Sequence, residues 1–312
     1  MENLLEIIKI YKRNFPFIIR ENEIVTGILS NKDNVIIEER NRQDRLVAVS
    51  VINGNAILLL CVDKEYRNQG IASKLLKESE SIIIKNGYNK IIIGIGPDYI
   101  MPGVPLAKSY YKTENEKLSH DISNNAAGFF TKRGYVHSCN CDFFDMKVSL
   151  DNFEKDGYNI GDTIENVTYK WATEEDIEGI CQCTDDAYQD FTKYYKDRQL
   201  YNGNKDIGVL IAVCDGIVAG TLIVKTGYID KDIGGFGCLT VRHDFQGKYI
   251  AVNLITIGTK YLKSIGLKEA FIGYTYSGLD HLYGYAGYKI WVYYMMAVKE
   301  IPDKLSGGQV QD

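Results

Sequence analysis

The sequence predicts an α/β fold of two tandem domains, each a mixed, mostly antiparallel sheet with a central βαβ unit and flanking helices. Three observations support this fold class: the length of 312 residues, an internal repeat, and one order of apolar runs in both halves. The length suits two domains of about 150 residues each. A repeat indicates that both halves share one plan.

The repeat is centred on two loops, EYRNQGIASKLL at 65–76 and DFQGKYIAVNLI at 244–255. An offset of 179 residues aligns Gly70 of the first loop with Tyr249 of the second. Three landmarks in one register indicate a duplicated domain. Without a gap, the same offset aligns two glycine pairs, Gly87 with Gly266 and Gly94 with Gly273.

Each half begins with alternating runs that predict antiparallel hairpins, at 34–54 in the first half and 208–227 in the second. Ahead of the first hairpin, MENLLEIIKIYKRNF has the spacing of an amphipathic helix. After the aligned loops, each half ends with a short helix, a Gly-Tyr pair and a long strand or hairpin. The two halves therefore share their first and last elements.

A strand, a polar loop, a helix-length stretch and a second strand surround each aligned loop. The apolar runs are AILLLCV (56–62) and KIIIGIG (90–96) in the first half, and GGFGCLTV (234–241) and EAFIGYT (269–275) in the second. Parallel strands need a helical crossover, so this order predicts a βαβ unit in each half.

The first half is longer by about 26 residues, because 64 residues separate Gly70 from Gly134 but only 38 separate Tyr249 from Gly287. The extra residues form an insertion at 97–123, which we expect to be a functional loop.

The predicted domain boundaries follow from these elements. The first domain covers 1–150 and the second 167–300, with a polar, acidic linker at 151–166 and a tail at 301–312. The loop of the second domain is degenerate, because it lacks the glycine at Tyr249.

Composition narrows the classes of partner. A net charge of −5 and a pI near 5.5 argue against nucleic acid and anionic membranes, which require clustered Lys and Arg. No apolar run approaches the roughly 18 residues of a membrane-spanning helix, and we expect a cytoplasmic protein. Seven cysteines in apolar surroundings suit reduced thiols. Two C-x-C pairs lack the C-x-x-C spacing of zinc sites, so we expect no metal.

The stretch RNQGIA (67–72), the phosphate loop, lies where a strand meets a helix. Backbone N–H groups at a helix N-terminus, with the positive end of the helix dipole behind them, bind phosphate. Gly70 lets phosphate oxygens approach the backbone, while Arg67 and Lys74 add cationic groups. Strand-to-helix turns also contain glycine for structural reasons, so spacing alone leaves both interpretations open.

Val62, Arg67, Gly70 and Ala72, spaced as V-x-x-x-x-R-x-x-G-x-A, resemble the acetyl-CoA signature of the GNAT acetyltransferase family. The stretch AAGFFTKRGY (126–135) resembles that family's later helix and glycine-aromatic pair. With the strand order, the likeness covers nearly all of both halves. The chain thus resembles a tandem GNAT protein, an arrangement shared with mycothiol synthase.

The resemblance implies acetyl-CoA as the cofactor, bound by the first half. Backbone amides at the end of the first βαβ strand would polarise the thioester carbonyl, with the amide of Cys61 as an oxyanion contact. The implied cofactor-binding residues are Leu60, Cys61, Val62, Arg67, Asn68, Gln69, Gly70, Ile71, Ala72, Ser73, Lys74 and Phe130.

Many members of the family protonate the departing thiolate with a tyrosine four residues before the glycine of the glycine-aromatic pair. That position is Phe130 in the first half and Tyr283 in the second. The first half keeps the phosphate loop without the tyrosine, whereas the second keeps Tyr283 but loses the loop glycine. Tyr283 is a candidate acid, and a packed aromatic residue is the other interpretation.

No carboxylate stands out as a general base, because neither first βαβ strand contains Asp or Glu. The candidates are Asp63, Glu65 and His137 in the first half and His281 in the second. A water chain to solvent is the alternative base.

The sequence therefore predicts an N-acetyltransferase that moves an acetyl group from acetyl-CoA to a primary amine of a small molecule or peptide, by direct attack in a ternary complex. Two alternatives remain: a non-catalytic acyl-CoA-binding or scaffolding protein, and an aminoacyl transferase that uses charged tRNA, which the acidic balance disfavours.

The acceptor is not identified by any motif. The acidic charge suits a cationic amine, and we expect a monomer or a homodimer. Residues of the insertion that we expect to cover the acceptor are Tyr99, Met101, Pro102, Tyr110 and Tyr111.

Overall fold

The computed structural model describes residues 2–94, 99–106, 125–155, 166–203, 206–227 and 231–302. Of the predicted insertion only 99–106 is therefore described. Tyr110 and Tyr111, together with most of the predicted linker and tail, lie outside the described residues.

Contacts divide the chain into two compact units. Unit 1 comprises Met1–Phe143 and Val292–Asp312, and unit 2 comprises Phe144–Trp291. This division differs from the predicted boundaries at 150 and 167, because segments at the end of each predicted domain are assigned to the other unit.

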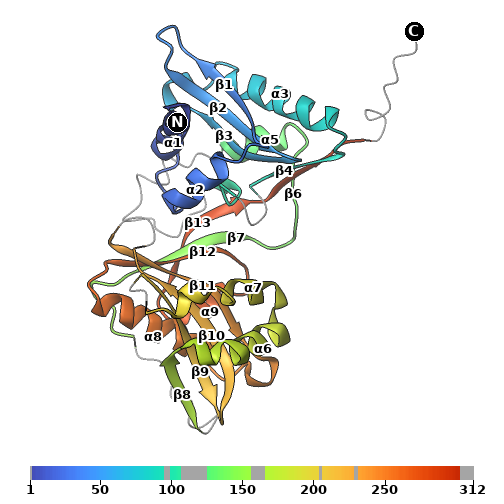
Figure 1. The fold of residues 1–312 in the computed structure, drawn as a ribbon. Coiled ribbons are helices and arrows are strands. Elements are labelled where there is room, and N and C mark those ends of the chain that lie inside the picture. The colour runs from blue at the N-terminus through green and yellow to red at the C-terminus, as the bar shows by residue number, and fades with distance from the viewer. Residues whose placement is uncertain are drawn as a thin grey trace. The chain divides into compact units, whose positions relative to one another are not determined.

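Unit 1 has a mixed sheet with helices on both faces (Figure 1). In spatial order its strands are β1 (Val35–Arg40), β2 (Leu46–Asn53), β3 (Ala56–Val62), β4 (Lys90–Ile93), β14 (Ala297–Glu300) and β6 (Val136–His137). Its helices are α1 (Glu2–Asn14), α2 (Asn22–Leu29), α3 (Ile71–Lys85) and α5 (Asn125–Thr131), and β5 (Val104–Leu106) follows the insertion's first described residues.

The two central strands β2 and β3 are buried almost throughout, because helices cover both faces of the sheet. On one face Ile57 and Val62 pack with Leu75 of α3 and Phe130 of α5. On the other face the Cys61 thiol lies against α1. The continuous apolar runs LVAVSVI and AILLLCV follow from this burial on both sides.

Unit 2 repeats the plan. The strand order includes β7 (Phe143–Ser149), β12 (Glu269–Tyr276), β11 (Ile233–Val241), β10 (Ile217–Lys225), β9 (Ile207–Cys214) and β8 (Val167–Trp171). Its helices are α6 (Ile177–Ala187), α7 (Thr192–Tyr195), α8 (Ile250–Ser264) and α9 (Asp280–Tyr285), and β13 (Lys289–Met295) follows α9.

The offset of 179 residues found in the sequence holds in the structure. Helix α3 at 71–85 corresponds to α8 at 250–264, residue for residue. The parallel pair Ile57–Ile93 of β3 and β4 corresponds to Phe236–Ile272 of β11 and β12. The predicted class of two mixed sheets, each with a central βαβ unit, is confirmed.

The last strand of the chain completes the sheet of unit 1. Strand β14 lies between β4 and β6 and pairs antiparallel with both. Met295, just before it, pairs with Val104 of β5. The predicted boundary at 300 places β14 in the second domain, because no local pattern tells a strand which sheet to join.

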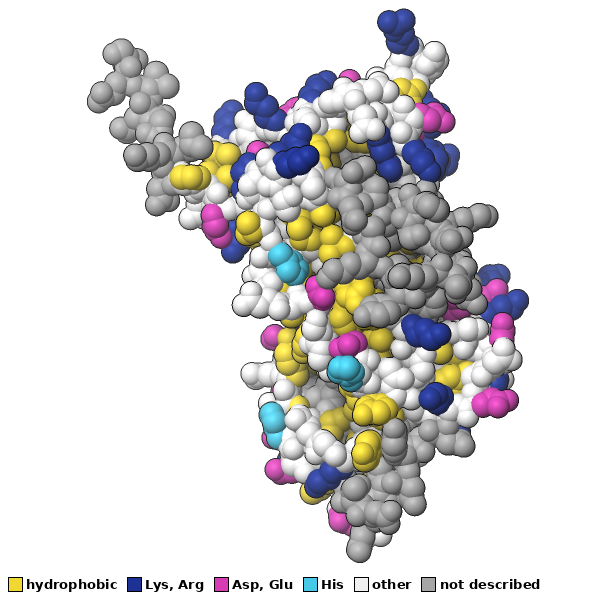
Figure 2. Space-filling model, turned by 180° about the vertical axis from the view of Figure 1, so that it is seen from behind, with side chains coloured by type: hydrophobic (Ala, Val, Ile, Leu, Met, Phe, Trp, Pro, Cys, Tyr) yellow, Lys and Arg dark blue, Asp and Glu magenta, His cyan; other side chains and the backbone are white. Residues whose placement is uncertain are grey.

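Charged side chains can be followed on the face of the molecule that Figure 2 draws. Figure 2 shows Lys and Arg side chains, in dark blue, gathered over unit 1 in the upper part of the view. Among the described helices, none is long and apolar enough to cross a membrane.

We predict that Val298→Pro destabilises the protein by about 3 kcal/mol, because β14 has a strand on each side at Val298 and proline removes its N–H donor. Val298→Ala is the matched control, since it keeps the amide and is expected to cost about 1–2 kcal/mol. Urea unfolding followed by circular dichroism measures both, and equal losses would contradict this role of β14.

Candidate functional site

The candidate site begins where β3 leaves β4. Within the part of the chain that the structure describes, which leaves out 95–98, the two strands pair only through Ala56 and Ile57, although β3 continues to Val62. Pairing with β2 shifts register at the same point, where Leu58 is the extra residue of a β-bulge. The edge of β3 beyond Ile57 is thus open toward the space that β4 would otherwise fill.

The phosphate loop follows this open edge and leads into α3. Asn68 and Gly70 both have left-handed backbone, with φ of 62° and 82°. Gly70 directly precedes the first residue of α3, and a Cβ atom built on it would meet no atom within 4 Å. Residues 67–70 are exposed and the first residues of α3 are half-buried, with Ala72 and Ser73 lining a cavity, so we expect the first amides of α3 to be accessible to an anion.

A cavity of about 400 Å³, the first cavity, lies between this loop, β3 and α5. Eight of the predicted residues line it: Leu60, Val62, Arg67, Asn68, Gly70, Ala72, Ser73 and Phe130. The sequence had not indicated the other lining residues, which are Asn14, Phe15, Phe17, Tyr66, Pro105, Ala126, Phe129 and Arg133.

Four predicted residues have other surroundings. The Cys61 thiol donates to the carbonyl oxygen of Ile10 at 3.7 Å, on the α1 side, and burial raises its pKa. Lys74 pairs with Glu39 at 2.5 Å, and the Gln69 side chain donates to the Glu65 carbonyl oxygen at 3.2 Å. Ile71 packs against the core of unit 1. The backbone role of Cys61 stays a prediction.

Arg133 is the most informative of the residues that sequence reasoning missed. It follows α5, stacks over the Phe129 ring at 3.8 Å and donates to the Ser73 hydroxyl at 2.8 Å. With Arg67 it gives the first cavity two guanidinium groups. The signal was present in AAGFFTKRGY, where a cation follows the short helix, but only the fold brings Arg133 to the phosphate loop.

Most of the described part of the insertion is packed, although Pro105 lines the first cavity. Met101 is 3% exposed, Pro102 is buried, and the Tyr11 hydroxyl donates to the Ile100 carbonyl oxygen at 3.0 Å. Tyr99 lies under the guanidinium of Arg20. Met101 and Pro102 therefore belong to the core of unit 1, which corrects their predicted place over the acceptor.

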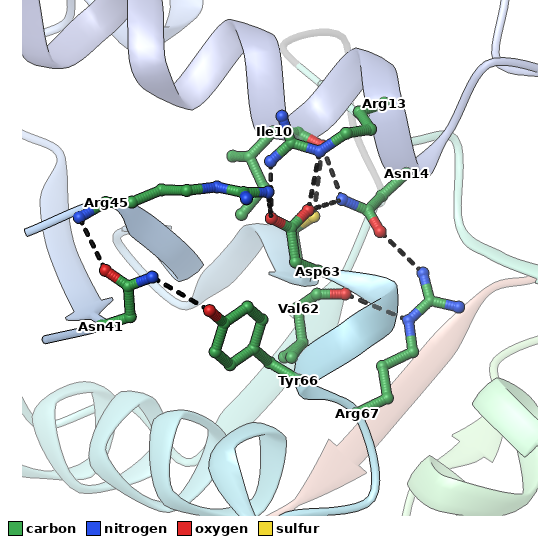
Figure 3. Close-up of polar contacts among 10 residues, drawn as sticks. Ile10, Arg13, Asn14, Asn41, Arg45, Val62, Asp63, Tyr66 and Arg67 are labelled. Carbon is green, nitrogen blue, oxygen red and sulfur yellow. Dashed lines mark hydrogen bonds and ion pairs between the residues drawn. The ribbon is translucent and has the colours of Figure 1, made fainter. Parts of the chain in front are cut away.

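Asp63 is the electrostatic centre of this region (Figure 3). Its carboxylate is buried and accepts hydrogen bonds from Arg13 at 3.0 and 2.6 Å, from Asn14 at 2.8 Å and from Arg45 at 2.9 Å. Burial alone would raise the pKa of Asp63, but these hydrogen bonds outweigh it and hold the pKa below its usual range. A carboxylate so engaged is a poor general base.

Both ring nitrogens of His137 are also engaged in hydrogen bonds. Its Nδ1 accepts from the Met296 N–H at 3.0 Å, so the proton lies on Nε2, which donates to the Cys141 carbonyl oxygen at 2.9 Å. His137 therefore links Met296, just before β14, with the turn that follows β6. Of the remaining base candidates, Glu65 and His281 are exposed.

Unit 2 keeps the backbone of the phosphate loop. Gly247 and Tyr249 have φ of 73° and 61°, at the positions of Asn68 and Gly70. Gln246 donates to the Val241 carbonyl oxygen at 3.0 Å, as Arg67 does to Val62 at 3.1 Å. A tyrosine is thus held in a conformation that favours glycine.

The chemistry of the loop is not kept in unit 2. Gln246 replaces Arg67, Tyr249 replaces Gly70, and the buried Ala286 stands where unit 1 has Arg133. The last equivalence follows from the turn after the short helix, where Tyr288 donates to the Tyr283 carbonyl oxygen as Tyr135 does to Phe130. Both guanidinium groups are therefore absent from the second copy.

Tyr283 lies on α9 and is 8% exposed. Its ring centroid is 6.5 Å from that of Tyr288, and burial raises the pKa of Tyr283 to about 12. The position suits a packed aromatic residue, and its role as an acid stays a prediction. Within the described residues, no group of three His, Cys, Asp or Glu side chains could hold a metal ion.

Residues 31–137 match the family model described as an acetyltransferase (GNAT) domain. A search of curated proteins finds no match. The family match thus covers the open strand edge, the phosphate loop and Arg133.

Solved structures share the fold over most of the chain. One is a GCN5-related glucosamine N-acetyltransferase region in a fungal multi-domain GH3 β-N-acetylglucosaminidase, with 17% identity and a TM-score of 0.71. That likeness covers 95% of this chain but 37% of the fungal protein, so the chain spans little more than a third of that protein's length.

Two further structures match over most of both chains. A GCN5-related N-acetyltransferase from Sphaerobacter thermophilus has 15% identity and a TM-score of 0.64, with 89% of this chain and 84% of that chain covered. A tandem GNAT protein from the clavulanic acid biosynthesis pathway has 13% identity and a TM-score of 0.61, with 89% and 87% covered. The predicted tandem GNAT fold is confirmed.

We predict that Asp63→Asn lowers the free energy of unfolding by roughly 2 kcal/mol at pH 7, because Arg13 and Arg45 lose a buried anionic partner. The pKa of Asp63 is depressed in the folded state, so its contribution is present above the unfolded pKa, about 4, and is lost as pH falls through the folded pKa.

Urea unfolding at neutral and at acidic pH checks this prediction. The difference between wild type and Asp63→Asn should shrink below about pH 4. Asp33→Asn, at an exposed turn position, is the matched control for loss of one carboxylate. A difference that does not change with pH would show that the ion pairs are not its cause.

Proposed function

We propose that unit 1 is an acetyl-CoA-dependent N-acetyltransferase that transfers the acetyl group to a primary amine. One observation carries the proposal: the first cavity joins an open strand edge, the accessible amides at the start of α3 and two guanidinium groups. Its volume of about 400 Å³ lies in the range typical of ligand sites, roughly 300–1,000 Å³.

The residues present fit the cofactor. The phosphate loop, Arg67 and Arg133 would hold the pyrophosphate, because backbone amides and guanidinium forks both bind phosphate oxygens. The apolar side chains of Leu60, Val62 and Phe130 would cover the less polar part of the molecule. The likeness of residues 31–137 to the GNAT acetyltransferase domain supports the same assignment.

Acetyl-CoA supplies the acetyl group as an activated thioester. The chain contributes orientation and electrostatics: amides on the open edge of β3, with Cys61 among them, would donate to the carbonyl oxygen as negative charge develops on it. Asp63 and His137 are occupied by hydrogen bonds, so the proton of the attacking amine is expected to pass to water rather than to either of them.

The proposal places cofactor binding in unit 1 alone. Unit 2 keeps the backbone of the loop but has lost both guanidinium groups and the loop glycine. We propose that the amine acceptor is a small molecule or peptide. A protein that binds acyl-CoA without transferring it is the alternative, and thiol release above background with a panel of amines would exclude it.

We predict that Gly70→Ala and Gly70→Tyr both cost about 1–2 kcal/mol of stability, because φ at position 70 is 82° and a side chain is strained there. Only Gly70→Tyr should weaken CoA binding at least tenfold, since its ring would enter the space in front of the loop that a Cβ atom leaves open. Isothermal titration calorimetry with CoA measures the affinities.

The alanine variant is the control for backbone strain in this comparison. Wild-type affinity in Gly70→Tyr would refute cofactor binding at the phosphate loop. Equal loss in both variants would indicate strain rather than a blocked site. No CoA binding by the wild-type chain would refute the proposed function as a whole.

We predict that Tyr283→Phe leaves the rate of thiol release within about twofold, because the proposal places the chemistry in unit 1 and Tyr283 is buried in unit 2. A fall of kcat by tenfold or more, with stability unchanged, would instead establish Tyr283 as the acid and unit 2 as a working site.

A further inference from the structure

A second cavity, of about 350 Å³, lies beside the first in unit 1. Asn14 and Arg67 line both cavities, so the two are adjacent. The second cavity is formed by the end of α1, the turn between β1 and β2, and the residues that follow β3. Its lining residues are Arg13, Asn14, Pro16, Arg45, Asp63, Lys64, Glu65 and Arg67.

The charge of the second cavity is opposite to that of the chain. Four cationic side chains and two carboxylates line it, whereas the chain as a whole carries a net charge of −5. One carboxylate, Asp63, is buried and already accepts four hydrogen bonds. The cations therefore outweigh the anions on the surface that a ligand would meet.

Hydrogen bonds hold the guanidinium groups in place, and some of their N–H donors are not used by these bonds. Asp63 fixes Arg13 through Nε and Nη2, and Arg45 through Nη2 (Figure 3). Arg45 is about half exposed, and among the described residues its Nε and Nη1 have no other hydrogen-bond partner. Arg67 donates from Nε to the Val62 carbonyl oxygen and from Nη2 to the Asn14 side chain. Among the described residues, its Nη1 has no hydrogen-bond partner. Such groups are pre-organised for a phosphate or carboxylate.

We propose that the second cavity binds an anionic group of the acceptor, a phosphate or a carboxylate, so that the substrate is an amine that also carries negative charge. This inference rests on the proposed function, since it takes the first cavity as the cofactor site. It replaces the expectation of a purely cationic amine, which came from the net charge of the chain. Net charge averages over the surface, whereas the ligand meets only the local cluster.

Because the two cavities are adjacent, an anionic group bound in the second would position the acceptor beside the first. An anion held by Arg13 and Arg45 would tether the acceptor next to the open edge of β3, from which Asp63 directly follows. A fixed second contact point lowers the entropy lost when the amine meets the thioester. The cluster would therefore determine which amines are used without touching the reacting atoms.

The test is calorimetric titration of the full chain with inorganic phosphate at low ionic strength, with and without saturating CoA. We expect phosphate to bind in the presence of CoA, and Arg45→Gln to weaken that binding at least tenfold. Arg42→Gln removes the same charge from an exposed position of the same turn and is expected to leave phosphate binding within about twofold.

Three results would overturn the proposal. The first is the absence of phosphate binding to the CoA-saturated protein, and the second is an equal effect of the two arginine substitutions. The third is displacement of phosphate by CoA but not by dephospho-CoA, which would assign the cavity to the cofactor's own 3′-phosphate. If CoA itself does not bind, the proposed function fails, while Arg45-dependent phosphate binding would still support an anion site.

Acceptor pairs that differ in one phosphate give a second readout, with glucosamine 6-phosphate against glucosamine and phosphoethanolamine against ethanolamine. We expect the phosphorylated member to have the higher kcat/KM, and Arg45→Gln to reduce that advantage through KM. Equal use of both members of a pair that reacts would contradict the proposal. Thermal unfolding and CoA affinity of Arg45→Gln control for damage to the Asp63 network.

Discussion

The early parting of β3 from β4 is the constraint on which the candidate site depends. Among the described residues the two strands pair only through Ala56 and Ile57, and at the same point a β-bulge at Leu58 interrupts the pairing of β3 with β2. The open edge leaves backbone groups unpaired by the sheet, and the chain after Val62 is then free to form the exposed phosphate loop. The first cavity lies where these features meet. Without the divergence, β4 would fill this space, and the loop would be an ordinary connection between the first strand and the helix of a βαβ unit.

The buried carboxylate of Asp63 ties the surrounding elements together. It receives hydrogen bonds from α1 and from the turn between β1 and β2, and its own backbone N–H donates to Val47. Four donors compensate the cost of burying the charge, which is why the pKa of Asp63 is lowered despite burial. The same contacts fix the arginines that line the second cavity. One set of hydrogen bonds thus connects the stability of unit 1 with the anion binding that we propose for the second cavity.

The two units share the backbone geometry of the loop but differ in the side chains that it carries. Left-handed residues, the loop-to-strand hydrogen bond, the helix bounds and the divergence of the parallel strands all recur at one offset. The side chains that would bind phosphate do not recur. Gly247 takes the position of Asn68 and Tyr249 that of Gly70, so the two αL positions are kept while the glycine has moved between them. The left-handed turn leads into the helix in both units, so the fold keeps its backbone conformation although its side chains differ.

The sequence by itself determined the repeat, the βαβ units and the position of the phosphate loop. These features depend on apolar periodicity and on a glycine next to a helix, which are local along the chain. It also contained Arg133 and Asp63 but gave no reason to join them to the loop, because their partners Ser73, Arg13 and Arg45 lie between 18 and 60 residues away.

Only the tertiary structure decided which sheet β14 completes, which residues of the insertion enter the core, and where the cationic groups gather. The place of β14 depends on pairing between segments more than 150 residues apart, as between Ala297 and His137. No local pattern of the sequence encodes that choice. The local positive charge of the second cavity arises in the same way. Side chains that are scattered in an acidic sequence are brought together by the packing of α1 and the first hairpin around a single buried carboxylate.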